Sequence, residues 1–461
     1  MGVVTFLDLS LFQSGGGGDP TKFAVQLLPL WSGTIPSEGV SNFPFGVVGP
    51  TDEVWTATTY VDDQVLDVVT GSTNQSIGVD IPENQTDYTR TVRIVAENAY
   101  GSAELSYTQN IGILVDIFYT VVDATSPVKI YDNYSGNLSY TIDDDTTEYT
   151  ATTYTFETTG EHIAHFKHGS SSTIQARAFS GATEVTGAYL RGITSTSANA
   201  FRATSLSALT ANTLTSLGTS TFDSCTNITW AIMPTGLTSI GQKAFYNSDL
   251  SGAVVIPATV TNIGSSAFTG TKINSLNFED RNTILDLSSA NAVFASNKQL
   301  TGATINPNVN ILNPNGFRDC TGLSVFNWSA MSESIGHATD ERSVRANQFT
   351  GCKSLVTITL PEGVEKVGNS SFSNCTNLVS IVLPASLSSN PAYAKQVHDN
   401  AFSGCTSLTS ITCYSETQPN FVEASFANMS STGVLYTPAN ADYSGWLAAL
   451  GEGWTQETIP A

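Results

Sequence analysis

The C-terminal two-thirds of the chain repeats one pattern of apolar positions about every 25 residues. A phenylalanine opens each copy, and in the clearest copy, residues 349–372, apolar side chains alternate over a short stretch that ends at a proline. Alternation predicts a short strand with one buried face, and proline ends it because it cannot donate to a strand ladder. One such winding cannot bury its own apolar edge, whereas stacked windings can, so the repeat predicts a solenoid of parallel coils. The repeat phenylalanines are Phe179, Phe201, Phe222, Phe245, Phe268, Phe294, Phe317, Phe349, Phe372, Phe402 and Phe426.

The position three residues after each repeat phenylalanine predicts a tight interior slot, because it is nearly always small. Five of the six cysteines occupy it: Cys225, Cys320, Cys352, Cys375 and Cys405. Six cysteines in 461 residues are too sparse for a disulfide scaffold, and free buried thiols are expected. A zinc site would need a Cys-x-x-Cys pair or clustered histidines, so no metal and no cofactor is predicted.

Two smaller β segments precede the repeats. Residues 21–111 contain short alternating runs separated by turn signals, which is typical of an immunoglobulin-like sandwich. Residues 112–170 hold a second set of such runs and form a smaller β module. The predicted fold class is therefore mainly β, with two Ig-like β-sandwich modules followed by a solenoid of stacked coils over residues 171–433 and a C-terminal segment over residues 434–461, which the resemblance below implies to be a leucine-rich-repeat solenoid and its cap.

The N-terminus, residues 1–20, reads as one apolar strand and a glycine-rich linker. Residues 3–12 alternate as in a strand, and Gly15 to Gly18 follow as a flexible joint. The strand either packs on the chain's own sheet or adds itself to the sheet edge of another subunit. In the second case the attachment residues are Val4, Phe6, Leu7, Leu9, Leu11 and Phe12.

Two segments resemble known families. Residues 171–433 resemble the BspA-type leucine-rich repeats in runs such as Ala401-Phe402-Ser-Gly-Cys405 and Val255-Ile256-Pro257, and the tail around Trp446 is similar to the closing cap of such arrays. The first β segment resembles the BACON carbohydrate-binding sandwich through Trp55, Asn84, Arg90 and Gln109, although Val65-Leu66 stands where that family has Trp-Leu. The two resemblances together imply adhesive surface or virion proteins of gut Bacteroidetes and their phages, with no catalytic residues to transfer.

Composition excludes several classes of function. The chain carries 18 Lys plus Arg against 40 Asp plus Glu, a net charge of −22, which disfavours nucleic-acid partners. No apolar stretch approaches the roughly 18 to 20 residues that span a bilayer. Residues 3–12 include Asp8 and have no preceding Lys or Arg, so no secretory signal is expected.

Two groups of side chains before the repeats are candidate metal ligands, and the sequence supports neither strongly. Asp143, Asp144 and Asp145 form either a Ca²⁺ site or an acidic turn, and they lack the calcium-loop frame. Among His162, His165 and His168, strand alternation puts the middle residue on the opposite face, so one strand cannot offer all three to a metal. No catalytic motif appears, so the chain is predicted not to be an enzyme, and a glycan-active enzyme remains a weaker alternative.

Two coils carry insertions, because the intervals after Phe317 and Phe372 are 32 and 30 residues. Insertions in solenoids fall on loops, often on a binding face. Aromatic side chains beside polar donors suit sugar stacking or a protein contact, although loop growth without function is the alternative. The predicted binding residues in or beside the insertions are Trp328, His337, Arg342, Tyr393 and His398, with Arg345 and Lys395 nearby.

The leading functional hypothesis is a phage virion structural protein, a fibre or decoration protein. Its N-terminus would bind other virion subunits, and its solenoid would bind host surface or mucosal glycans or proteins at the virion surface. The alternative is a secreted or surface-anchored bacterial adhesin on the cell surface or outside the cell. A homo-oligomer is compatible with either role, but no heptad pattern sets a subunit number.

Overall fold

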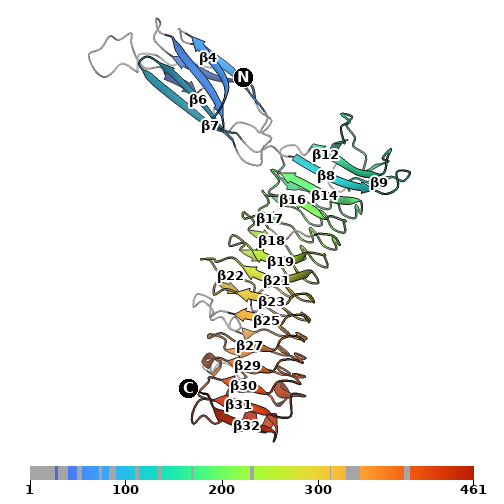
Figure 1. The fold of residues 1–461 in the computed structure, drawn as a ribbon, viewed down its shortest axis with the longest axis vertical. Coiled ribbons are helices and arrows are strands. Elements are labelled where there is room, and N and C mark those ends of the chain that lie inside the picture. The colour runs from blue at the N-terminus through green and yellow to red at the C-terminus, as the bar shows by residue number, and fades with distance from the viewer. Residues whose placement is uncertain are drawn as a thin grey trace, which may run out of the picture. The chain divides into compact units, whose positions relative to one another are not determined.

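A computed structural model describes the chain as two compact units, residues 1–113 and 114–461. Both are built mainly from strands (Figure 1). None of the helices in the described part of the chain has the length and apolar character needed to cross a bilayer. The described residues are 26–29, 40–48, 54–71, 75–82, 90–109, 114–132, 138–167, 171–228, 233–311, 313–328, 343–388 and 395–460.

The first unit consists of two antiparallel sheets. One has the order β1-β2-β5 and the other the order β4-β3-β6-β7. Apolar side chains of both sheets pack into one core around Trp55, which is fully buried. Gly71 pairs with Trp55 across the second sheet, and a Cβ there would lie 2.3 Å from the indole ring, so only glycine fits. The strands are β1 (Gln26–Pro29), β2 (Val40–Val48), β3 (Trp55–Val61), β4 (Gln64–Gly71), β5 (Gln75–Ile81), β6 (Arg90–Asn98) and β7 (Gly101–Gln109).

The second unit opens with a sheet that continues into the solenoid. Its order is β10-β12-β8-β14-β16, and β14 pairs antiparallel with β8 on one side and parallel with β16 on the other. Residues 114–167 therefore cover the edge of the first coil. The strands are β8 (Leu114–Val121), β10 (Ser139–Ile142), β12 (Gly160–Lys167), β14 (Val185–Arg191) and β16 (Ala208–Thr210), with a side pair β9 (Val128–Lys129) and β11 (Thr153–Tyr154).

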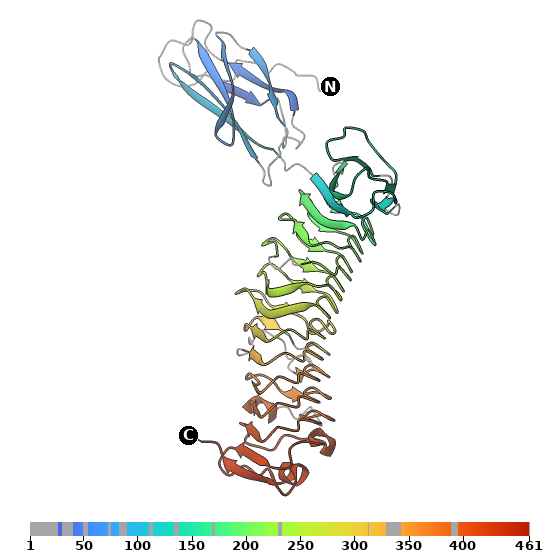
Figure 2. The same cartoon turned by 45° about the vertical axis from the view of Figure 1, so that its right-hand side comes forward.

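The solenoid carries two stacks of parallel strands, which we call the long ladder and the short ladder (Figure 2). The long ladder contains β19 (Ser251–Ile256), β21 (Lys272–Phe278), β23 (Gly302–Ile305), β25 (Val325–Trp328), β27 (Thr357–Thr359), β29 (Ser380–Leu383), β30 (Ser410–Cys413), β31 (Gly433–Thr437) and β32 (Trp454–Thr458). The short ladder contains β13 (Thr173–Ile174), β15 (Ser195–Thr196), β17 (Ser216–Leu217), β18 (Ser239–Ile240), β20 (Asn262–Ile263), β22 (Leu285–Asp286), β24 (Val309–Asn310), β26 (Ser343–Val344) and β28 (Lys366–Val367).

The repeat phenylalanines form one continuous buried column between the two ladders. All eleven are at most 5% exposed. Each ring stacks on the next, with centroids 5.1–6.0 Å apart and planes within 4–23° of parallel. The predicted solenoid of stacked coils is therefore confirmed, and its eleven buried rings correspond to about 11 coils.

A second column runs beside the rings, at the position three residues after each one. Ten of its eleven members are buried, and Met429 is partly exposed. Each of the five cysteines donates its thiol to the carbonyl of the phenylalanine one coil earlier, as Cys375 does to Phe349 at 3.1 Å. All six cysteines are free thiols, as predicted. Burial raises the pKa of Cys225 to about 11 and that of Cys320 to about 12.

A compact cap closes the last coil. Helix α1 (Ser444–Leu450) presents Trp446, whose ring lies edge-on to Phe426 at 5.2 Å and whose indole N–H donates to the Pro419 carbonyl. Two short 3₁₀ helices, η3 (Ala385–Ser388) and η4 (Glu423–Phe426), complete the described helices. The aromatic column therefore ends under a buried tryptophan rather than in solvent.

Candidate binding groove

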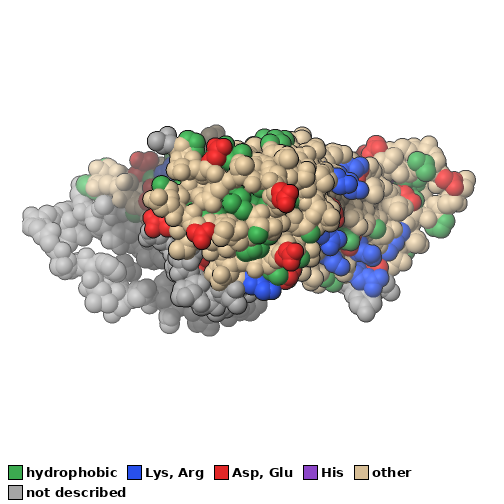
Figure 3. Space-filling view, turned by 90° about the horizontal axis from the view of Figure 1, so that it is seen from below, with side chains coloured by type: hydrophobic (Ala, Val, Ile, Leu, Met, Phe, Trp, Pro, Cys, Tyr) green, Lys and Arg blue, Asp and Glu red, His purple; other side chains and the backbone are tan. Residues whose placement is uncertain are grey.

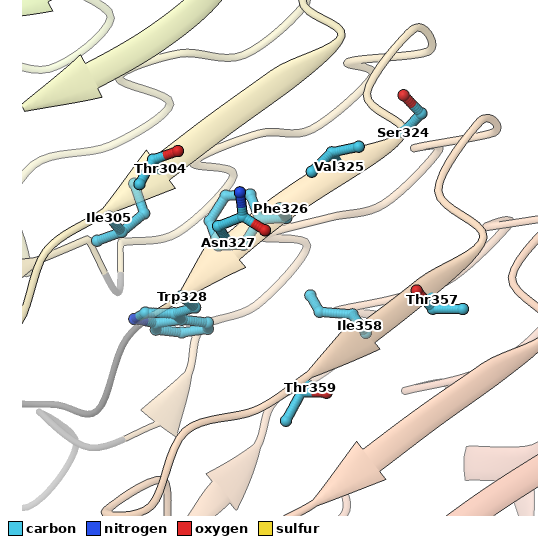
Figure 4. Close-up of a pocket in the computed structure, with 10 residues that line it drawn as sticks. All are labelled: Thr304, Ile305, Ser324, Val325, Phe326, Asn327, Trp328, Thr357, Ile358 and Thr359. Atoms are coloured by element: carbon cyan, nitrogen blue, oxygen red, sulfur yellow. The ribbon is translucent and has the colours of Figure 1, made fainter.

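The long ladder is interrupted at one point. One sheet runs β19-β21-β23-β25 and ends there, and a new sheet begins at β27 and continues to β32. A groove of about 520 Å³ lies over the interruption (Figure 4). Its lining residues are Thr304, Ile305, Ser324, Val325, Phe326, Asn327, Trp328, Thr357, Ile358 and Thr359.

A large inward-facing ring lies at the interruption. Phe326 stands at the register position that Leu276 and Ala303 occupy in the two preceding strands. Its ring lies edge-on to Phe317 at 5.1 Å and to Phe349 at 4.9 Å, so it contacts the aromatic column above and below. We infer that this bulk keeps β25 and β27 from pairing, because an aromatic ring replaces aliphatic side chains in a close-packed interior.

Trp328 forms the aromatic end of the groove. It is the last residue of β25, its ring is partly exposed, and it lies edge-on to Phe326 at 5.7 Å. Figure 4 shows Asn327 projecting beside it, with Thr357 and Thr359 on the neighbouring strand. Val325, at 50% exposure, adds an apolar surface.

The described lining of the groove carries groups suited to binding and none suited to acid–base chemistry. Its ten lining residues supply hydroxyl groups, one side-chain amide and apolar surface, and none of them titrates near neutral pH. An aromatic ring beside hydroxyl and amide groups can stack on a flat apolar face and orient it with hydrogen bonds.

Comparison with known proteins agrees with the repeat architecture. A family model described as "BspA type Leucine rich repeat region (6 copies)" matches residues 150–274, 215–339 and 324–444, more than half of the chain. The chain belongs to this family. No curated protein matches it.

Among solved structures, this BspA-type chain is similar to three proteins, two of them described as leucine-rich. A leucine rich cell surface protein from Faecalibacterium prausnitzii A2-165 has 18% identity over 52% of this chain and 76% of that one, with a TM-score of 0.31. The pneumococcal vaccine antigen PcpA has 16% identity over 62% and 76%, with a TM-score of 0.37. A leucine-rich repeat protein from Bacteroides ovatus has 18% identity over 70% and 98%, with a TM-score of 0.28.

The structure separates the predicted binding residues of the BspA-type solenoid. Trp328 lies in the groove, whereas His398 follows Val397, which bridges to Val367 and Phe421 on the side of the short ladder. Lys395 pairs with Asp399 at 3.7 Å. His337, Arg342 and Tyr393 lie outside the described residues, as do the predicted attachment residues Val4, Phe6, Leu7, Leu9, Leu11 and Phe12.

Sequence reasoning missed the polar partners of Trp328. Asn327, Thr357 and Thr359 look like ordinary outward strand positions, because the interruption that groups them into a groove is visible only in three dimensions. The available signal was indirect. Three of the other long strands run into a leucine or isoleucine followed by proline, at Ile256-Pro257, Leu360-Pro361 and Leu383-Pro384, whereas this one ends at a tryptophan where an insertion starts.

Two of the histidine side chains that were candidate metal ligands before the repeats pair with aspartate carboxylates, one of which, Asp143, was itself a candidate. Asp143 lies 2.7 Å from His162 Nδ1 and accepts the Ile163 N–H at 2.8 Å. His165 Nδ1 lies 2.8 Å from Asp116 instead. Within the described ranges no three His, Cys, Asp or Glu side chains gather as a metal site would need. The acidic turn is therefore the interpretation that these contacts support.

Proposed function

We propose that this chain is a non-enzymatic adhesin of the bacterial cell surface whose solenoid binds a host glycan or protein through the groove at Trp328. The observation that carries the proposal is the interrupted long ladder, over which a partly exposed tryptophan and several hydroxyl-bearing residues line one groove. Membership of the BspA-type family favours a binding role, because the matched family model indicates no catalytic family.

A glycan is the ligand that we favour. A sugar ring presents an apolar face that stacks on indole, and its hydroxyl groups exchange hydrogen bonds with threonine hydroxyls and with the Asn327 amide. The ten described lining residues carry no charge, which favours a neutral sugar at this site, because none of them would compensate a carboxylate or sulfate.

The test is a glycan array probed with the full chain and with Trp328→Ala. Loss of the stacking surface should weaken binding at least tenfold, which corresponds to about 1.4 kcal/mol. Tyr414→Ala is the matched control, because Tyr414 is an exposed aromatic residue of the solenoid outside the groove lining. Equal binding by Trp328→Ala and the unsubstituted chain would exclude the groove as the site.

A phage virion role is a second proposal, and it rests on the alternating apolar residues 3–12 and the glycine joint after them. In that role the attachment residues would pair with another virion subunit, and the chain would sit at the virion surface. Electron microscopy of the assembly that contains the chain tests it directly. A lipidated or signal-bearing precursor exported by a bacterium would favour the adhesin instead.

We also propose that residues 21–111 form the BACON-like Ig-like sandwich. The domain boundaries of the chain then fall near residues 20, 111, 170 and 433. Two sheets that share one core around Trp55 support the first assignment, and Arg90 and Gln109 lie opposite each other on neighbouring strands. Limited proteolysis should cut near residue 111, and protection of that segment would contradict the boundary.

A further inference from the structure

One edge of the solenoid carries positive charge in an otherwise acidic chain. Residues 1–170 hold 22 Asp plus Glu against five Lys plus Arg. Around the phenylalanine turns, by contrast, the residues from three before to four after each ring, in the eight coils from Phe179 to Phe349, include seven basic residues and three acidic ones. We call the seven the basic edge: Arg177, Arg202, Lys243, Lys272, Lys298, Arg318 and Lys353.

Backbone hydrogen bonds place these residues on one edge, because they stack the phenylalanine turns in register. The Arg177 N–H donates to the Ala198 carbonyl, the Lys243 N–H to the Ser265 carbonyl, and the Ser296 N–H to the Arg318 carbonyl. At about 4.8 Å per coil, the eight coils extend over roughly 34 Å. Figure 3 shows Lys and Arg side chains gathered on one flank.

The acidic residues of the edge are already neutralised. Arg202 pairs with Asp223 at 3.4 Å, Lys272 with Asp249 at 2.6 Å, and Arg318 with Asp319 at 3.2 Å. The remaining lysines, Lys243, Lys298 and Lys353, are exposed and have no carboxylate within ion-pair distance among the described residues. Each is therefore available to a partner's anionic group.

We propose that the basic edge binds a linear anionic polysaccharide through its carboxylate or sulfate groups. A line of cations spaced along stacked coils fits a partner that bears anionic groups at intervals along an extended chain. A nucleic acid fits less well. Its dense phosphates call for concentrated cations, and a single strand also needs aromatic platforms, whereas the Tyr246 ring on this edge is already covered by the Lys243 ammonium, 5.2 Å from its centroid.

The proposal rests on the proposed function only in placing the chain where it meets surface polysaccharides. The basic edge shares no residue with the described lining of the groove, and the two sites call for different ligand chemistry. Loss of neutral-glycan binding in Trp328→Ala tests the groove, and loss of anionic-polymer binding in the lysine variants tests the edge. Failure of one therefore leaves the other standing.

The experiment measures affinity of the full chain for heparin and for polygalacturonate, with neutral dextran as a reference, over a range of salt concentrations. The edge variant combines Lys243→Gln, Lys298→Gln and Lys353→Gln. The control variant combines Lys366→Gln, Lys395→Gln and Thr455→Glu, which makes the same charge change away from the edge. Matched circular dichroism and melting curves establish that both variants fold.

We expect binding to at least one anionic polymer and none to dextran. The edge variant should bind at least tenfold more weakly, and its dependence of log affinity on log salt should be shallower by about one per lysine. The control variant should bind within twofold of the unsubstituted chain. The proposal is overturned if neither anionic polymer binds at low salt, if both variants weaken equally, or if single-stranded DNA of matched charge competes better than either polysaccharide.

Discussion

Each repeat phenylalanine points inward because its turn contains left-handed backbone on both sides. In most coils the residues two before and two after the ring have φ between about 51° and 79°, as at Asn315 and Asp319 around Phe317. Only glycine adopts this conformation without cost, and asparagine and aspartate tolerate it best. The frequent Asn, Gly and Ser beside each ring therefore follow from the shape of the turn.

Ala292 adopts this left-handed conformation although it is not glycine, asparagine or aspartate, which predicts a stabilising substitution. Its φ is 55°, where a Cβ costs about 1–2 kcal/mol, whereas glycine gives up about 0.5–1 kcal/mol of that in chain entropy. We expect Ala292→Gly to raise the free energy of unfolding by up to about 1 kcal/mol, measured by urea denaturation. Ala295→Gly is the control, because Ala295 is buried and has no positive φ, and it should destabilise. Equal effects at the two sites would contradict the argument.

The aromatic column predicts a large loss of stability when any interior ring is removed. Phe268 is fully buried and stacks on Phe245 and Phe294, both at 5.3 Å. Phe268→Ala should lower the free energy of unfolding by about 3–5 kcal/mol, because it removes a ring and leaves a cavity. Denaturant midpoints measure this, with Tyr414→Ala as an exposed aromatic control that should change stability by less than about 0.5 kcal/mol. A loss no larger than the control's would show that the rings do not hold the coils together.

At the scale of elements, the described strands before the first coil act as its cover. β8 occupies the edge of β14 that no coil fills, over the register from Val115–Leu190 to Tyr119–Val185. An uncovered edge strand is a template for pairing with another chain, and repeat arrays need terminal caps for solubility. A boundary near residue 170 therefore separates two sequence patterns but cuts through one hydrogen-bonded sheet.

Two truncations test this cover. A fragment of residues 114–461 should stay monomeric and melt within about 3 °C of the full chain's second transition. A fragment of residues 171–461 should melt lower and associate, because β14 loses its antiparallel partner. Melting curves and light scattering distinguish the outcomes. Equal behaviour of the two fragments would mean that β8 contributes nothing to the solenoid.

At the scale of the whole molecule, the features that could be predicted from the sequence are those that recur in many copies of the repeat. The repeat phenylalanines and the mostly small residues three positions later recur from coil to coil, so each copy supports the others. The groove depends instead on a single event, the failure of β25 and β27 to pair around Phe326, and no periodic signal marks it. The joining of β8 to β14 was equally invisible, because it links antiparallel strands far apart in the sequence.

Buried thiols in successive coils also make the molecule sensitive to alkali. Burial raises the pKa of Cys320 and Cys405 to about 12 and places that of Cys352 well above the ordinary range. In the unfolded chain the same thiols ionise near pH 8.5, so between that pH and about 12 the unfolded state loses protons that the folded state keeps. Stability should therefore be full below pH 8.5 and fall as the pH rises, by about 2 kcal/mol per thiol at pH 10.

The measurement is urea denaturation under reducing conditions from pH 7 to 10.5, comparing the chain with a Cys320→Ala, Cys352→Ala and Cys375→Ala variant. Alanine suits this slot, because Ala182 fills it in the first coil. The variant should be less stable at pH 7, where it lacks three thiol hydrogen bonds, but should lose less stability with rising pH. Part of the loss should persist, since burial also raises the pKa of Tyr140 to about 12. If the two curves stay parallel to pH 10.5, the thiols do not couple folding to pH.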